Sequence, residues 1–95
     1  MAQNTTIGLD ADTWTQLTDG DVTAITFQNR GSGDILVQVT ATASAPTGTG
    51  GAIRYKPGQG EIGIELASLQ PGVASGARLY AYAEGENADV FVSNA

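Results

Sequence analysis

One segment of the sequence has the glycine spacing of a nucleotide-binding loop. Residues 58–63 read Gly-Gln-Gly-Glu-Ile-Gly, and glycines at this spacing let a backbone approach a pyrophosphate at the start of a helix. The context favours a different structure, because Pro57 precedes the segment and residues 61–66 alternate as a strand. We therefore interpret residues 57–60 as a turn and predict no bound cofactor.

A second group of candidate functional residues lies near the N-terminus. It consists of four aspartates, Asp10, Asp12, Asp19 and Asp21. Hard cations such as calcium bind where several carboxylate or carbonyl oxygens surround one point. The spacing does not fit a calcium loop, because Trp14 stands at the fifth position from Asp10 and the sixth position is not glycine. We interpret these aspartates as solvated turn residues and predict no metal site.

Two pairs of glutamates could supply the acid and base of a glycosidase, in which two carboxylates flank the scissile bond. These pairs are Glu61 with Glu65 and Glu84 with Glu86. The first pair occupies alternate positions of a strand whose other positions are apolar, and the second lies in a turn. Exposed acids on a solvated face are the better interpretation, so no catalytic residue is predicted.

The aromatic side chains Trp14, Tyr55, Tyr80, Tyr82 and Phe91 could form a stacking platform for sugars. Tyr80 and Tyr82 share one face of a predicted strand, opposite small and aliphatic residues. That face is either covered or exposed, so core, subunit interface and ligand site remain alternatives for these rings. Because tyrosine is enriched at protein contacts, we favour an interface that includes Trp14, Tyr80 and Tyr82.

The composition argues against an enzyme. The 95 residues contain no cysteine and no histidine, which removes disulfides, thiolate or imidazole metal ligands, and the commonest nucleophiles and proton carriers. A domain of this size without disulfides often gains stability by association. We therefore expect a non-catalytic protein that assembles with copies of itself.

The net charge of −6 makes nucleic acid an unfavourable partner, because four basic residues offer little surface for phosphate contacts. No apolar stretch approaches the length of a membrane span, and no basic region followed by an apolar run is found at the N-terminus. We expect neither a nucleic-acid partner nor a membrane.

Alternating apolar residues predict an all-β chain. Residues 22–29 place Ile25 and Phe27 on one face, and residues 35–42 place Ile35, Val37 and Val39 on one face. The turn at residues 30–34 is expected to join these two segments in a hairpin.

Further alternating segments bring the expected total to seven or eight short antiparallel strands. They are residues 5–9, 14–17, 52–56, 61–66, 79–83 and 90–93. Residues 66–69 are compatible with a single helical turn, which Pro71 ends. Short strands at this spacing are typical of a β-sandwich.

The polar segment 1–12 differs from the remainder of the chain, which we expect to be a single β-sandwich domain over residues 13–95. We expect residues 1–12 to be an arm that orders on assembly, with Ile7 and Leu9 as contact residues.

Several segments together give the chain a resemblance to small virion proteins of tailed bacteriophages. They are residues 20–33, 35–42, 45–47 (Ala-Pro-Thr), 51–54 (Gly-Ala-Ile-Arg) with Pro57-Gly58, and 78–83 (Arg-Leu-Tyr-Ala-Tyr-Ala). Within that group the chain resembles capsid decoration or cement proteins.

The resemblance implies a jelly-roll-like β-sandwich subunit, often a homotrimer, that binds the major capsid protein on the exterior of the phage head and stabilises it. It implies a virion protein made in the cytoplasm of the bacterial host, and it transfers no functional residue. The alternative function is a tail-associated adhesion or carbohydrate-binding module.

Overall fold

Eight strands and one helical turn form the regular structure of residues 2–95, the part of the chain that this computed structural model describes. The elements follow the chain in the order β1 (Gln3–Leu9), β2 (Trp14–Gln16), β3 (Ala24–Asn29), β4 (Ile35–Thr40), β5 (Ile53–Tyr55), β6 (Gly60–Glu65), α1 (Leu66–Leu69), β7 (Arg78–Ala83) and β8 (Ala88–Asn94). The predicted all-β fold is confirmed, and the predicted helical turn at residues 66–69 is present as α1.

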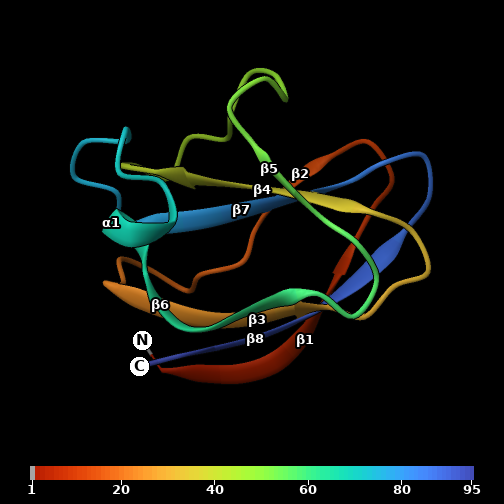
Figure 1. The fold of residues 1–95 in the computed structure, drawn as a ribbon, viewed down its shortest axis with the longest axis horizontal. Coiled ribbons are helices and arrows are strands. Elements are labelled where there is room, and N and C mark those ends of the chain that lie inside the picture. The colour runs from red at the N-terminus through yellow and green to blue at the C-terminus, as the bar shows by residue number, and fades with distance from the viewer. Residues whose placement is uncertain (1) are drawn as a thin grey trace.

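The strands form two antiparallel sheets that pack face to face (Figure 1). Sheet A has the strand order β1-β8-β3-β6, and sheet B has the order β2-β7-β4-β5. Strand pairs β1·β8, β2·β7, β3·β6 and β4·β5 are all neighbours, as when one long antiparallel ribbon is rolled into two sheets. This connectivity is that of an eight-stranded jelly-roll β-sandwich.

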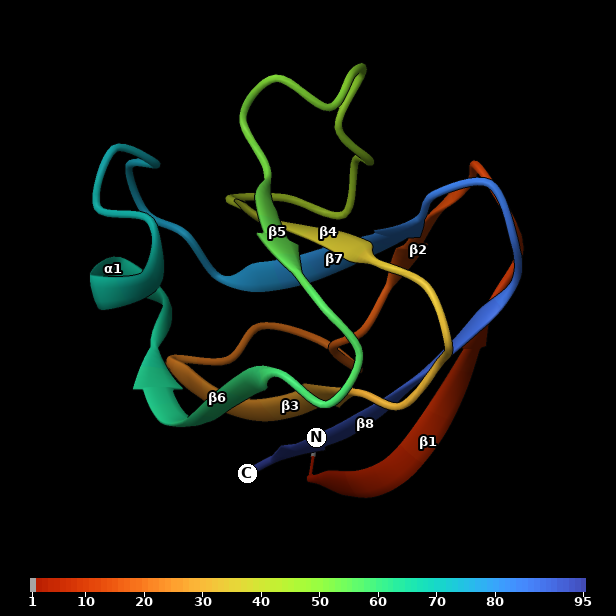
Figure 2. The same ribbon diagram turned by 45° about the vertical axis from the view of Figure 1, so that its right-hand side comes forward.

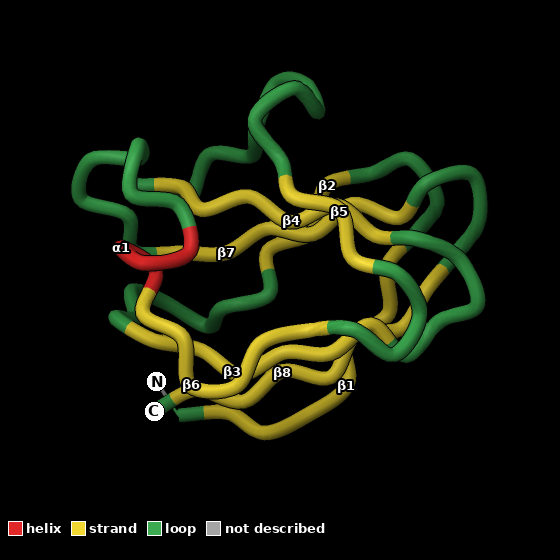
Figure 3. The backbone as a smooth tube through the Cα atoms, in the orientation of Figure 1, coloured by secondary structure: helices red, strands yellow, loops and turns green. Residues whose placement is uncertain are grey.

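The core lies between the sheets and comes from the alternation that the sequence displays. Ile25 and Phe27 of β3, and Ile35, Val37 and Val39 of β4, are each at most 1% exposed. The inward positions predicted for these two strands are therefore confirmed. The helical turn α1 lies between the two layers at one end of the sandwich (Figure 3), and its residue Leu66 is buried.

The predicted hairpin of residues 22–29 and 35–42 is wrong. β3 pairs with β6 and β8 in sheet A, whereas β4 pairs with β5 and β7 in sheet B. The five residues between them carry the chain from one layer to the other at the end of the sandwich opposite α1. Alternation identifies the face that a strand buries, and both strands bury that face in the same core, but it does not identify the neighbour.

Most of the segment expected to be an arm belongs to the sheet. Residues 3–9 form β1, whose pairing with β8 continues over all seven residues from Gln3↔Asn94 to Leu9↔Ala88. Leu9 is 1% exposed and Ile7 packs partly buried against the core. The sandwich therefore begins at Gln3 rather than at residue 13, while Met1 lies outside the described residues.

Candidate functional site

Strand β6 contains a bulge that changes which of its residues face the core. Ile64 pairs with Ile25, but Phe27 pairs with Glu61, so two residues of β6 stand opposite Thr26. Gly63 takes a left-handed conformation with φ +58°, and its N–H donates a hydrogen bond of 2.8 Å to the hydroxyl of Thr26. A glycine in this conformation is typical of a bulge with one extra residue.

The bulge turns Ile62 outward. The alternation of residues 61–66 puts the acids on a solvated face and so implies that Ile62, Ile64 and Leu66 point inward, but the side chain of Ile62 is 91% exposed. Leu66 is buried and Ile64 is partly buried, so the expectation is correct on the C-terminal side of the bulge and wrong at Ile62. Ile62 is thus a large, freely exposed aliphatic side chain on a protein surface.

Beside Ile62, the outer face of sheet A has a hollow of about 290 Å³. The ring of Phe91, half-buried on β8, lines this hollow together with Thr26 and Gln28. Gly60 lines it as well, and a β-carbon at that position would lie 1.9 Å from the carbonyl oxygen of Phe27. Only glycine fits there, because β6 approaches the backbone of β3 closely at this point.

We call this surface the docking face. Its strands also present small polar side chains outward, and they are Asn4, Thr6, Thr26, Gln28 and Ser93. Two acids lie on the same face, Asp89 on β8 and Glu65 on β6. An apolar contact point on a polar, acidic surface is an arrangement suited to binding another protein.

Behind the docking face, one pair of aromatic residues packs in the core. Phe27 and Tyr55 meet edge to face across the core, with ring centroids 5.0 Å apart. The Tyr55 hydroxyl donates a hydrogen bond of 3.0 Å to Oε2 of Glu61, the residue before Ile62. Burial, and then the hydrogen bond and charge of Glu61, raise the pKa of Tyr55 above its ordinary value.

We expect the raised pKa of Tyr55 to lower stability in alkali. The unfolded chain releases this proton near pH 10, whereas the folded chain retains it, so the free energy of unfolding falls as the pH rises above about 10. Urea unfolding between pH 8 and 11 should show a shallower decline for Tyr55→Phe than for the native chain. Parallel declines in the two proteins would contradict this assignment.

The outer face of sheet B carries the three aromatic residues predicted as contacts. Trp14 and Tyr82 pair across strands β2 and β7, and their ring centroids are 5.2 Å apart at a tilt of 53°. Both are half-buried. Tyr80 is only 5% exposed, and its hydroxyl hydrogen-bonds with Gln16 Oε1 and with the carbonyl of Ala43. Tyr80 is therefore covered by its own chain.

Charged groups border the Trp14–Tyr82 pair. Arg54 contacts Glu84 and lies 3.3 Å from Oδ2 of Asp34, and the hydrogen bond with Glu84 is the main cause that raises the pKa of Arg54. Burial, followed by the nearby carboxylate of Asp12, raises the pKa of Tyr82. The pair thus stands in a polar, mainly acidic setting.

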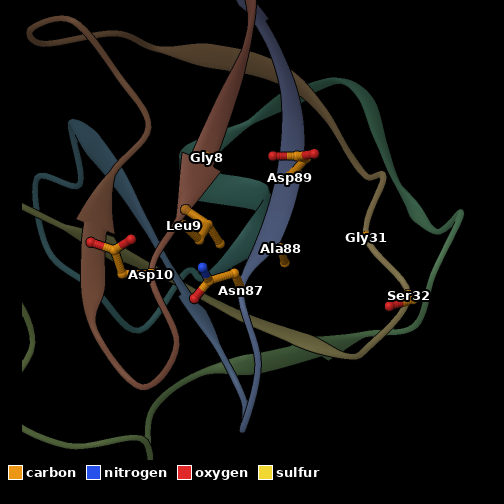
Figure 4. A pocket seen from close by; sticks show the side chains of 8 residues that line it. All are labelled: Gly8, Leu9, Asp10, Gly31, Ser32, Asn87, Ala88 and Asp89. Carbon is orange, nitrogen blue, oxygen red and sulfur yellow. The ribbon is translucent and has the colours of Figure 1, made fainter.

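A larger hollow, of about 450 Å³, opens where three loops meet at one end of the sandwich (Figure 4). The carboxylates of Asp10 and Asp89 lie on two sides of it, with Asn87 between them. Asn87 already accepts a hydrogen bond from the backbone of Ala11. These groups can accept hydrogen bonds, but two separated carboxylates do not make a metal or catalytic site.

The glycine motif of residues 58–63 is divided between a turn and a strand, as predicted. Gly58 has φ +85° in the turn, and β6 begins at Gly60. Within residues 2–95, no group of three or more acidic, histidine or cysteine side chains is arranged to hold a metal ion.

The five predicted contact residues divide between two places. Trp14, Tyr80 and Tyr82 share the outer face of sheet B, whereas Ile7 and Leu9 face the interior from β1. Leu9 and Tyr80 are buried within the single chain, so they are not available to a partner. The prediction missed Ile62, although a glycine next to it inside a strand is a signal for a bulge.

The fold defines the chain as an eight-stranded jelly-roll β-sandwich. Comparison with known families, curated proteins and solved structures finds no match for this chain. In residues 2–95, no helix has the length and apolar character that crossing a membrane requires.

Proposed function

We propose that this protein is a non-enzymatic structural protein that binds a larger protein surface through the docking face. The observation that carries the proposal is Ile62, which a bulge holds almost fully exposed beside the hollow at Phe91. Ile62 and the half-buried ring of Phe91 line the same hollow, so an otherwise polar face offers a joint apolar contact point to a partner. Side chains that fill a pocket at the centre of an interface supply much of its binding energy.

The acids on the docking face indicate the chemistry of the partner. A face-to-face contact between two copies would place Glu65 and Asp89 of both copies, four carboxylates of like charge, in one interface, which disfavours it. A surface with an apolar depression and a basic rim fits better. The resemblance to capsid decoration proteins supports the major capsid protein on the exterior of a phage head as that surface.

We expect Ile62→Asp to weaken binding to assembled heads at least about tenfold, because it replaces the apolar contact with a desolvated charge. Co-sedimentation with mature phage heads that lack the protein would measure this loss. Since Ile62 is 91% exposed, the variant should fold normally. Heads carrying the native protein should also release their DNA at a higher temperature, because a ligand of the intact shell stabilises it.

Thr47→Asp is the matched control, because it adds the same charge at an exposed position of the loop between β4 and β5, the two strands of sheet B that this loop joins. It should bind as the native chain does. Native binding by Ile62→Asp, or failure of the native protein to co-sediment with heads, would overturn the proposal.

The Trp14–Tyr82 pair favours one alternative, a tail-associated module that binds carbohydrate. Half-buried aromatic rings with carboxylates and an arginine around them resemble surfaces that stack on sugar rings. Trp14 is the single tryptophan of the chain, so its fluorescence reports directly on this face. Quenching by host polysaccharide, together with no binding to heads, would favour the alternative.

A further inference from the structure

The four edge strands of the sandwich differ in how they are protected from pairing with another chain. Edge strands present unpaired backbone groups, and proteins protect them with short length, charged side chains or bulges. β2 and β5, the edges of sheet B, are three residues long each. β6, one edge of sheet A, carries two glutamates and the bulge at Gly63.

β1, the other edge of sheet A, has none of these protections. It is seven residues long, its register with β8 is continuous, and its sequence Gln-Asn-Thr-Thr-Ile-Gly-Leu contains no charge and no proline. Figure 2 shows β1 along the outer margin of sheet A, beyond β8. Within residues 2–95 no strand pairs with its second edge.

We infer that β1 pairs antiparallel with β1 of a second copy and joins the two A sheets into one continuous sheet, four strands from each copy. An antiparallel edge is complementary to itself about a twofold axis. In a chain of net charge −6, this uncharged strand also lets two copies meet without opposing carboxylates at the contact.

The register follows from the length of β1. Thr6 is its central residue, and placing Thr6 on the twofold axis lets all seven residues pair. Thr6 then faces Thr6 of the second copy, and Thr5 faces Ile7 on the inner side. Ile7 is only partly buried and Thr5 is exposed in the single chain, so the pairing covers the open margin of the core.

The pairing also bears on the docking face. A twofold axis perpendicular to a continuous sheet leaves the outer faces of both copies on the same side. The dimer therefore presents two Ile62 side chains toward one surface, and two linked contacts bind more tightly than one. The pairing itself does not depend on what the docking face binds, and it is measured on the isolated protein.

The test is sedimentation equilibrium of the full chain and of Thr6 variants. The native protein should form a species of twice 9.7 kDa. Thr6→Lys and Thr6→Glu place like charges opposite each other on the axis, and each should raise the dissociation constant of the dimer about fivefold. A mixture of the two variants should restore the dimer, because opposite charges then meet across the axis.

Gln28→Lys and Gln28→Glu are matched controls, because Gln28 is exposed on the same face and Phe91 lies between it and Thr6 in the sheet. They make the same charge changes away from the edge and should leave the dimer intact. A native monomer at high micromolar concentration, a native trimer, or equal effects at Thr6 and Gln28 would each overturn the inference.

Discussion

A chain from which Met1 to Asp10 has been removed should lose its cooperative fold. The deletion removes β1, and with it the side chain of Leu9, which is 1% exposed, and the partly buried side chain of Ile7. Cutting a buried leucine back to alanine alone costs about 2–5 kcal/mol. The deletion also removes the second aliphatic residue and the backbone pairing of seven residues with β8. The total loss is then comparable to the free energy of unfolding of a typical small domain, about 5–15 kcal/mol.

Far-ultraviolet circular dichroism and a thermal melt would measure this loss. Leu9→Ala in the full chain should lower the free energy of unfolding by about 2–5 kcal/mol. Thr6→Ala, at an exposed position of the same strand, should change it by less than about 0.5 kcal/mol. A truncated chain that melts cooperatively at the native temperature would show that β1 is dispensable.

For β1, the sequence did not reveal that the segment belongs to the sandwich. Gln3 to Thr6 are polar, and the segment looks like an arm because its alternation has only Ile7 and Leu9 on the inner side. In the structure β1 pairs with β8, whose inward residues Val90 and Val92 are fully buried. β8 is therefore an inner strand of the sheet, and β1 is the edge strand. An edge strand needs fewer apolar residues than a central strand. The alternation of apolar residues is therefore a weaker signal for an edge strand.

The inward faces of β3 and β4 were predictable because Ile25, Phe27, Ile35, Val37 and Val39 stand at every second position. For β7 the pattern left open which face is covered, and the structure buries Leu79, Ala81 and Ala83 fully, opposite Tyr80 and Tyr82. Strand pairing was not predictable in the same way. Every inward face in a sandwich meets the same core, so the pattern cannot distinguish a hairpin from a crossover between layers.

The candidate site was missed for a local reason. The alternation of residues 61–66 is strict, and nothing in the apolar pattern marks the place where it is broken. The break depends on Gly63 adopting a left-handed conformation and on the Thr26 hydroxyl that accepts its N–H. The glycine and the threonine belong to different strands. The outward orientation of Ile62 therefore depends on how the two strands pair and not on β6 alone.

Asn29→Ala should destabilise the protein by at least about 3 kcal/mol, since every buried polar group left without a partner costs about 1–3 kcal/mol. Asn29 is fully buried at the end of β3, where the chain leaves sheet A for sheet B. Its amide nitrogen donates to the carbonyls of Gly33 at 2.8 Å and Tyr55 at 3.1 Å, and its oxygen accepts from the N–H of Gly31 at 2.9 Å. One side chain thus holds the crossover loop against β5.

Asn29→Asp separates this role from simple packing, because the side chain keeps its shape but its second oxygen now faces two carbonyl oxygens. Burial and these oxygens raise the pKa of the new carboxyl above its unfolded value of about 3.9. Relative to the native chain, the variant should therefore be least affected near pH 3, where both states are protonated. It should lose up to about 1.4 kcal/mol per pH unit as the pH rises toward its folded pKa.

Urea unfolding of the native chain and both variants at pH 3 and pH 7 would measure these effects. The loss caused by Asn29→Ala should be similar at the two pH values, whereas the loss caused by Asn29→Asp should grow with pH. Gln28→Ala is the control, because it removes an exposed amide that donates to Gly58 from the neighbouring position. If Gln28→Ala cost as much as Asn29→Ala, or if Asn29→Asp showed no dependence on pH, the buried amide would not be what holds the two sheets in register at this crossover.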